Sequence, residues 1–317
     1  MRTANGVPHI TAPDLQTLAY GVNRFWQMYA TVPGRLDVMG AATGNSPVVQ
    51  IGSNKDVAWS HTVSTGKRFT IHELKLVPGD PTSHLVDGQP EKMHSHTVTV
   101  LVRADKGPPA QKSLTLWTSR WGPMLSAPRL GLNWTPSVGS AIQDANAGNA
   151  RSTDTWLGFA TATSVQDMRQ ALRNLGMPWV NTIAADCHGN AMYADVSVVP
   201  DLDAADLARC APSAKVAALR GALGLIVVDG SRSDCGWKHD ASSAVPGLIP
   251  IERMPIAVRS DWVHNSNDSF FYTNPAQTWS GISVMGGDDI VRRPRTRSGL
   301  IEIPELIARG PWPRLRA

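Results

Sequence analysis

Cys187 and His188 are adjacent in the sequence, and a thiol beside an imidazole is the pair that cysteine hydrolases use for nucleophilic catalysis. Neighbouring residues in a strand or turn usually point in opposite directions, which argues against a working pair. The sequence also contains no G-x-S-x-G segment, which would expose a nucleophilic serine at a sharp turn. The residue types therefore identify no nucleophile by themselves.

Histidines are the next residues that could support chemistry. His94 and His96 would share one face of a strand, and His61, His72 and His84 are near in sequence. No carboxylate or cysteine completes a set with the spacing of metal ligands. We therefore predict no metal and no other cofactor.

Composition excludes two classes of partner. The chain has 317 residues, 42% of them hydrophobic and 18% charged, with a formal net charge of +4. The local basic run Arg292–Arg297 has no accompanying aromatic stripe or reader motif, so we expect a solvated surface and no nucleic acid. No apolar stretch approaches the roughly 20 residues that span a bilayer, so we expect no membrane span.

The elements that must position any site are mostly strands. An apolar run at 48–51, a polar turn at 52–56 and a second strand at 57–63 predict neighbours in an antiparallel sheet. Alternation predicts a strand over 69–76, and Asp87-Gly88 predicts a hairpin turn. Further strands are predicted over 97–102 and 113–117, the latter ending at a turn, Gly122-Pro123.

The second half of the chain mixes one clear helix with hairpins and loops. Ser164 and Asp167 resemble a capping box, and Met168, Leu172 and Leu175 lie on one side of the helix that follows, which should end at Gly176. A hairpin over 180–197 should turn at residues 188–190, and residues 200–250 are rich in loops. This pattern predicts an α+β class with antiparallel sheets.

Longer segments resemble a known family. VPGRLDVMGAAT (32–43), PVVQIG (47–52), VAWSHTVST (57–65), WGPML (121–125), GMPWVNTIAAD (176–186), VHNSNDS (263–269) and PRTRSGL (294–300) resemble the β chain of penicillin-acylase-type N-terminal nucleophile hydrolases. The most similar branch deacylates N-acyl-homoserine lactones and lipopeptides. The resemblance implies an αββα sandwich of antiparallel sheets, incomplete here, and a small-molecule N-acyl substrate without a cofactor.

The resemblance also implies site residues. The backbone N–H of Val63 and the side chain of Asn267, with Asn265 as the alternative, match the donors of an oxyanion hole. Arg297, with Arg295 as its rival, matches a supporting arginine. Two further pairs are implied: Trp156 and Trp179 in the acyl-chain pocket, and Cys210 with Cys235 as a disulfide, the alternative being two free buried thiols. The segment Ser64–Arg68 contains no acid, which argues against the calcium that some penicillin acylases bind there.

The family's N-terminal serine, and the histidine that follows it, have no counterpart in the sequence. We expect an internal deletion at 22/23, with 1–22 matching the start of the α chain, 23–300 a partial β chain and 301–317 a divergent tail. Family members are exported α/β heterodimers. The chain shows no signal peptide, so periplasmic or secreted localisation is expected by family and cytoplasmic localisation if it is expressed as written. The two hypotheses are an acyl amide hydrolase and a catalytically inactive remnant or acyl-binding module.

Overall fold

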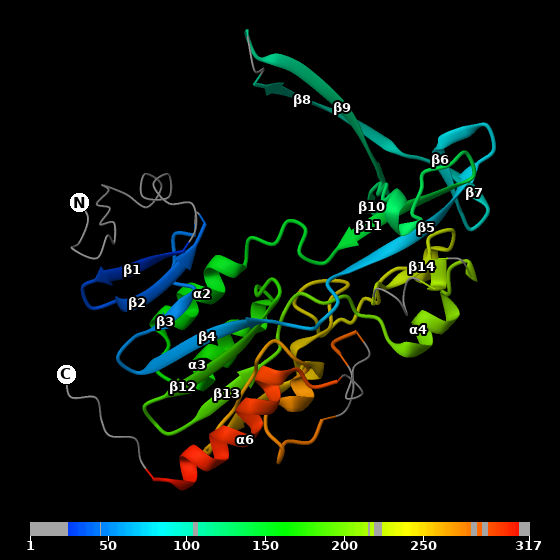
Figure 1. The fold of residues 1–317 in the computed structure, drawn as a ribbon. Helices are drawn as coiled ribbons and strands as arrows, with labels where there is room; N and C mark the ends of the chain where they lie inside the picture. The colour runs from blue at the N-terminus through cyan, green and yellow to red at the C-terminus, as the bar shows by residue number, and fades with distance from the viewer. Residues whose placement is uncertain are drawn as a thin grey trace. The chain divides into compact units, whose positions relative to one another are not determined.

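The computed structural model describes residues 25–44, 46–103, 107–214, 216–218, 224–279, 284–286 and 291–310. They belong to two compact units (Figure 1). The first unit draws on residues 1–66, 148–198 and 241–317, and the second on 67–147 and 199–240. The expected junction at 22/23 and residues 311–317 of the expected tail lie outside the described residues.

The first unit is built on a seven-stranded antiparallel sheet in the order β1-β2-β3-β4-β12-β13-β15. The predicted antiparallel neighbours are confirmed, because β3 pairs with β4, but the first strand covers 51–53 rather than the predicted 48–51. The predicted hairpin over 180–197 is confirmed as β12 and β13. The bounds are β1 Phe25–Val32, β2 Leu36–Thr43, β3 Ile51–Ser53, β4 Val57–Val63, β12 Val180–Asp186, β13 Ala191–Ala194 and β15 Ile256–Arg259.

The two faces of this sheet differ in burial. On one side, which we call the helix face, Met28, Val38 and Trp59 are buried. Helix α2 (Ser152–Thr161) contacts β2 and α3 (Val165–Ala171) contacts β12 and β13, and Trp59 packs on Phe159 of α2. The opposite side, the open face, carries the alternate residues of the same strands.

The helix predicted after Ser164 begins as expected. The Ser164 side chain accepts the Asp167 backbone N–H, although the Asp167 carboxylate bonds to Thr163 rather than back to Ser164. Met168, Leu172 and Leu175 are fully buried, the last two in and after the 3-10 turn Leu172–Asn174. The first unit also contains the 3-10 turns Ile251–Arg253 and Phe270–Tyr272 and the helix α6, Pro294–Ala308.

The second unit contains two further sheets. The five-stranded one has the order β11-β5-β6-β7, with β14 parallel to β5, and the three-stranded one is β10-β9-β8. The Asp87-Gly88 turn joins β6 to β7 as predicted, whereas Gly122-Pro123 pairs with β9 as a short strand, so the predicted turn there was misplaced by two residues. The bounds are β5 Phe69–Val77, β6 Asp80–Val86, β7 Gln89–Lys92, β8 His94–Val102, β9 Ala110–Ser119, β10 Gly122–Pro123, β11 Val138–Asp144 and β14 Val227–Asp229, with α4 Ala204–Arg209 and 3-10 turns at Pro128–Leu130 and Ser233–Cys235.

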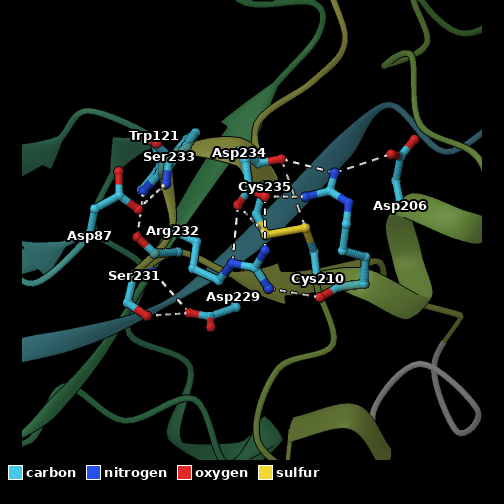
Figure 2. Close-up of a disulfide and its surroundings, with 12 residues drawn as sticks. Asp87, Trp121, Asp206, Cys210, Asp229, Ser231, Arg232, Ser233, Asp234 and Cys235 are labelled. Atoms are coloured by element: carbon cyan, nitrogen blue, oxygen red, sulfur yellow. Dashed lines mark hydrogen bonds and ion pairs between the residues drawn. A yellow bond between two sulfur atoms is a disulfide. The ribbon is translucent and has the colours of Figure 1, made fainter.

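Cys210 and Cys235 form a disulfide in the second unit (Figure 2). The bond joins the end of α4 to the turn after β14, and Arg209 and Arg232 both bind the Asp234 carboxylate beside it. Because the pair closes a loop with a sequence separation of 25, it restrains an otherwise loop-rich segment. The sheets and few helices confirm the α+β class, and no described helix is long and apolar enough to cross a membrane.

Candidate active site

Val63 is the last residue of β4, and its backbone N–H faces away from β12. The Ser64 N–H donates to the Trp179 carbonyl at 3.0 Å, while Val63 is paired with Val180. In an antiparallel ladder the N–H groups of successive residues alternate in direction, so that of Val63 points to the other side of β4. On that side β3 pairs with β4 at Trp59 and Ala58, away from the strand end.

Asn267 lies against this strand end. Its Nδ2 is 3.3 Å from the Val63 carbonyl oxygen, and its backbone φ of 68° is in the left-handed region that Asn tolerates better than most residues. The Asn267 backbone N–H donates to Asn265 Oδ1 at 2.8 Å. A primary amide has two N–H groups, so one can bind Val63 while the other binds a ligand.

Two arginines of the predicted basic run occupy different positions on α6. Arg295 Nη2 donates to Asn267 Oδ1 at 2.8 Å, which fixes the direction of the Asn267 amide and polarises its N–H groups. The Arg297 side chain is exposed on the same helix. Arg293 adds a second guanidinium, with its Nη1 3.4 Å from the Asn267 carbonyl oxygen. Asp268 Oδ1 lies 3.4 Å from Arg293 Nε, so two guanidinium groups and one carboxylate leave a net positive charge beside the Asn267 amide, which favours an oxyanion.

A polar network, half-buried at Thr62 and Asn265 and fully buried at Asn181 and Tyr193, holds the Asn267 loop on the open face of the sheet. Asn265 Oδ1 accepts from Thr62 Oγ1 at 2.6 Å and from Asn181 Nδ2 at 3.2 Å. Asn181 is fully buried, and its Oδ1 accepts the hydroxyl of Tyr193 at 2.9 Å. Neither Thr62 nor Asn181 was predicted as a site residue from the sequence. The signal that could have indicated them is a polar residue facing the same side of the sheet on each of two neighbouring strands.

Asp268 joins the same loop to helix α6. Its carboxylate is 2% exposed and accepts the Thr296 hydroxyl at 2.5 Å and the Arg293 backbone N–H at 3.1 Å. Gly299 makes the close approach possible, since an added Cβ would lie 2.4 Å from Nε2 of His264. These contacts place the first turn of α6, and with it Arg295, beside Asn267.

His61 and Trp156 form a neutral pair on the helix face. The Asn181 carbonyl, which can only accept, lies 3.0 Å from His61 Nδ1, and the Trp156 indole N–H donates to His61 Nε2 at 3.0 Å. Burial lowers the pKa of His61 to about 4, so the ring is neutral at pH 7. Trp156 is buried and Trp179 is half exposed, beside the strand end that carries Val63.

Hydroxyl groups near Val63 already have partners. Thr62 donates to Asn265, Ser64 donates to Asp195 at 3.0 Å, and Thr65 donates to the Met285 carbonyl at 2.9 Å. Ser266 Oγ lies 2.9 Å from Nε2 of His264, and burial lowers the pKa of that imidazole. None of these contacts brings a hydroxyl to the Asn267 amide.

Cys187 and His188 lie closer together than the sequence suggested. Their Sγ and Nε2 atoms are 3.8 Å apart, because Asp186 and Gly189 form a tight turn that makes adjacent side chains converge. The prediction that they point apart was therefore wrong. The turn nevertheless follows the far end of β12, about 20 Å of strand from Val180.

Among the described residues, one group of side chains has ligand atoms close enough together to hold a metal ion. Cys210, Asp234 and Cys235 have ligand atoms within 4.8 Å of one another, but both sulfurs are joined in the disulfide. His94 and His96 are exposed on β8.

Comparison with known proteins places this geometry in context. A family model described as penicillin amidase matches residues 1–301. Aculeacin-A acylase from Actinoplanes utahensis is 45% identical over 290 residues, covering 91% of this chain and 36% of that protein. Acyl-homoserine lactone acylase PvdQ from Pseudomonas savastanoi pv. phaseolicola is 41% identical over 270 residues, covering 85% of this chain and 34% of that protein.

A solved structure has a similar fold. Thermostable penicillin G acylase from Alcaligenes faecalis gives a TM-score of 0.64 at 18% identity, covering 89% of this chain and 44% of that chain. At this identity the match shows the fold alone. The chain thus spans little more than a third of the length of these two acylases.

Proposed function

Because the chain belongs to the penicillin amidase family, we propose that its Val63–Asn267 site binds the carbonyl oxygen of an N-acyl amide and stabilises the oxyanion of amide hydrolysis. The observation that supports this most is the Asn267 amide, held 3.3 Å from the Val63 carbonyl oxygen and polarised by Arg295. Two fixed N–H donors of this kind stabilise a tetrahedral intermediate without any change of charge.

The substrate class follows from the relatives. The matched proteins are named as acylases of aculeacin A and of acyl-homoserine lactones, so we assign this site an amide between a fatty acyl group and a polar amine. Trp156 and the half-exposed Trp179 are the proposed contacts of the acyl chain. In this assignment Arg295, rather than Arg297, supports the oxyanion donor, because Arg295 is the arginine that binds Asn267.

The attacking group is the second part of the proposal. We propose that the described residues provide the oxyanion donors and not the nucleophile. This is supported by the hydrogen bonds that the Thr62 and Ser64 hydroxyls already donate to Asn265 and Asp195. Hydrolysis would then need a complementary polypeptide, as in an α/β heterodimer. The same observation favours the alternative function, an acyl-binding module without catalysis.

A chromogenic acyl amide tests the proposal. The purified chain is mixed with a medium-chain fatty acyl p-nitroanilide, and nitroaniline release is followed for the wild type, Asn267→Gly and Asn146→Ala. Gly suits the left-handed φ of position 267, and Asn146 lies in a surface turn of the other unit. Nitroaniline release that appears only when the remaining segment of aculeacin-A acylase is added, and that falls about 100-fold in Asn267→Gly alone, supports hydrolysis. Saturable binding of the amide without release under either condition supports the acyl-binding alternative. Release by the purified chain alone contradicts the assignment of the nucleophile to another polypeptide, and the absence of both binding and release contradicts the proposed site.

A further inference from the structure

Two guanidinium groups hold the residue that carries the proposed side-chain oxyanion donor. Arg295 Nη2 donates to Asn267 Oδ1 at 2.8 Å, and Arg293 Nη1 lies 3.4 Å from the Asn267 carbonyl oxygen. One arginine is the N-cap of α6 and the other lies in its first turn. The start of this helix therefore places two positive charges on one asparagine, one at its side chain and one at its backbone.

These contacts leave both guanidinium groups able to bind a further oxygen. A guanidinium has five N–H groups. Arg295 donates to Asn267 through Nη2, and Arg293 contacts Asn267 and Asp268 through Nη1 and Nε. A ligand oxygen can therefore accept from Nη1 or Nε of Arg295, and from Nη2 of Arg293, while Asn267 stays in place.

The charges around Asn267 favour an anion at this position. Among the described residues, Asp268 supplies the one carboxylate in contact with these arginines, and it is almost completely buried. The Thr296 hydroxyl and the Arg293 backbone N–H donate to it from inside the fold. Burial lowers the pKa of His264 in the same loop, so that this imidazole is neutral at pH 7. A positive excess remains, and it attracts a negatively charged ligand group more strongly than a neutral one.

The distance from the oxyanion donor fits a carboxylate on the amine part of a substrate. Arg295 Nη2 is 2.8 Å from Asn267 Oδ1, which shares a carbon atom with the Nδ2 donor, so the two nitrogen atoms lie within about 5 Å. In an N-acyl amino acid the carboxylate lies about 3 to 5 Å from the acyl carbonyl oxygen, because three bonds separate the two carbonyl carbons. A fatty acyl chain has no charged group on its own side of the amide.

We propose that Arg293 and Arg295 form an anion subsite, and that the preferred ligands of this chain are N-acyl amides whose amine part carries a carboxylate. N-acyl amino acids and the ring-opened form of an N-acyl-homoserine lactone belong to this class. The closed lactone ring carries no charge and therefore makes weaker hydrogen bonds to a guanidinium. The inference rests on the proposed function in one respect: the acyl carbonyl oxygen is bound at Asn267.

Pairs of ligands that differ in one charge test the subsite. Calorimetric titrations of the purified chain near pH 7 compare N-octanoylglycine with its methyl ester, and N-octanoyl-homoserine with its lactone. We expect each carboxylate to bind about tenfold more tightly than its neutral partner at about 20 mM salt. The preference should fall to about threefold at about 0.5 M salt, because salt screens the attraction between exposed charges.

Three variants assign this preference to the start of α6. Arg293→Met should lower the ratio of the two affinities to less than threefold, whereas Arg293→Lys keeps the charge and should retain most of the ratio. Arg309→Met removes an arginine that pairs with Glu305 at the other end of the helix, and the ratio should not change. The ratio is taken within each variant, since a general loosening of the site weakens the charged and neutral ligands alike.

Equal binding of charged and neutral ligands by the wild-type chain, or an unchanged ratio in Arg293→Met, overturns the anion subsite. The proposed function survives that result if either ligand saturably shifts the side-chain amide signal of Asn267 in nuclear magnetic resonance spectra. Octanoate is a further control: if it binds as tightly as N-octanoylglycine, the arginines recognise the carboxylate of the acyl product and the proposal is overturned. Absence of binding for every ligand contradicts the subsite and the proposed function together.

Discussion

Replacing Thr296 with valine tests how helix α6 is held to the Asn267 loop. Thr296 is fully buried, and its hydroxyl donates to the Asp268 carboxylate, which is 2% exposed. Valine keeps the shape of the Thr296 side chain and removes its hydroxyl donor. A hydrogen bond to a charged group contributes about 1.5 to 3 kcal/mol. The Arg293 backbone N–H, 3.1 Å from the same oxygen, still donates a hydrogen bond to the carboxylate. We therefore expect the free energy of unfolding to fall by about 2 kcal/mol.

Thr296→Ser is the matched control, because it keeps the hydroxyl and removes one methyl group at a cost of about 1 kcal/mol. Urea unfolding followed by circular dichroism measures both variants. With a slope near 3 kcal/mol per molar urea, the valine variant should unfold at about 0.7 M less urea than the wild type. A serine variant as destabilised as the valine variant would show that packing, and not the hydroxyl–carboxylate bond, holds the helix.

Three further predictions follow from other contacts. Arg295→Met should weaken acyl amide binding about tenfold and Arg297→Met less than twofold in calorimetric titrations, because Arg295, unlike Arg297, binds the Asn267 side-chain amide; equal effects would contradict this assignment. Burial lowers the pKa of His61 to about 4 in the fold from its ordinary value of 6.5, so the unfolded chain binds the proton more readily. The contribution of neutral His61 to the free energy of unfolding should be fully present above about pH 6.5 and should be lost as the pH falls towards 4. Urea titrations at each pH should show a shallower fall for His61→Gln than for the wild type. Part of the pH dependence should remain in this variant, because the pKa of His72 is also lowered to about 4. Removing the disulfide by Cys210→Ala with Cys235→Ala should cost about 3 kcal/mol, and an unchanged melting temperature would show that the loop is restrained by other contacts.

The strands could be predicted from the sequence because their signals are local. Alternation over 69–76 and the Asp87-Gly88 turn depend on neighbouring residues, and the structure contains both. The Gly122-Pro123 turn was misplaced because Gly122 adopts a φ of 115° inside a strand pairing, where a glycine usually marks a turn. A Cβ at position 122 would lie 2.2 Å from the Ile142 carbonyl oxygen, and this contact, 20 residues along the chain, cannot be recognised from the neighbours of Gly122.

The site residues likewise divide into those that could be predicted from local sequence and those that depend on distant contacts. Val63 and Asn267 could be predicted because the segments that contain them resemble those of the family. The structure brings the two residues together at the end of one strand. Thr62 and Asn181 were missed because their partners are far along the chain, with Thr62 and Asn265 separated by 203 positions. The choice between Arg295 and Arg297 depends on where α6 begins, since residues two apart on a helix point about 200° apart.

The most direct test of the account is to observe the two proposed donors while an N-acyl amide binds. The chain is labelled with ¹⁵N at valine and asparagine and titrated with N-octanoyl-homoserine lactone, and amide resonances are followed by nuclear magnetic resonance. We predict that the Val63 backbone N–H and the Asn267 side-chain NH₂ shift together and saturably, while the Asn146 signals stay in place. Saturable shifts at other asparagines and valines, with these two groups unchanged, would contradict the proposed oxyanion site.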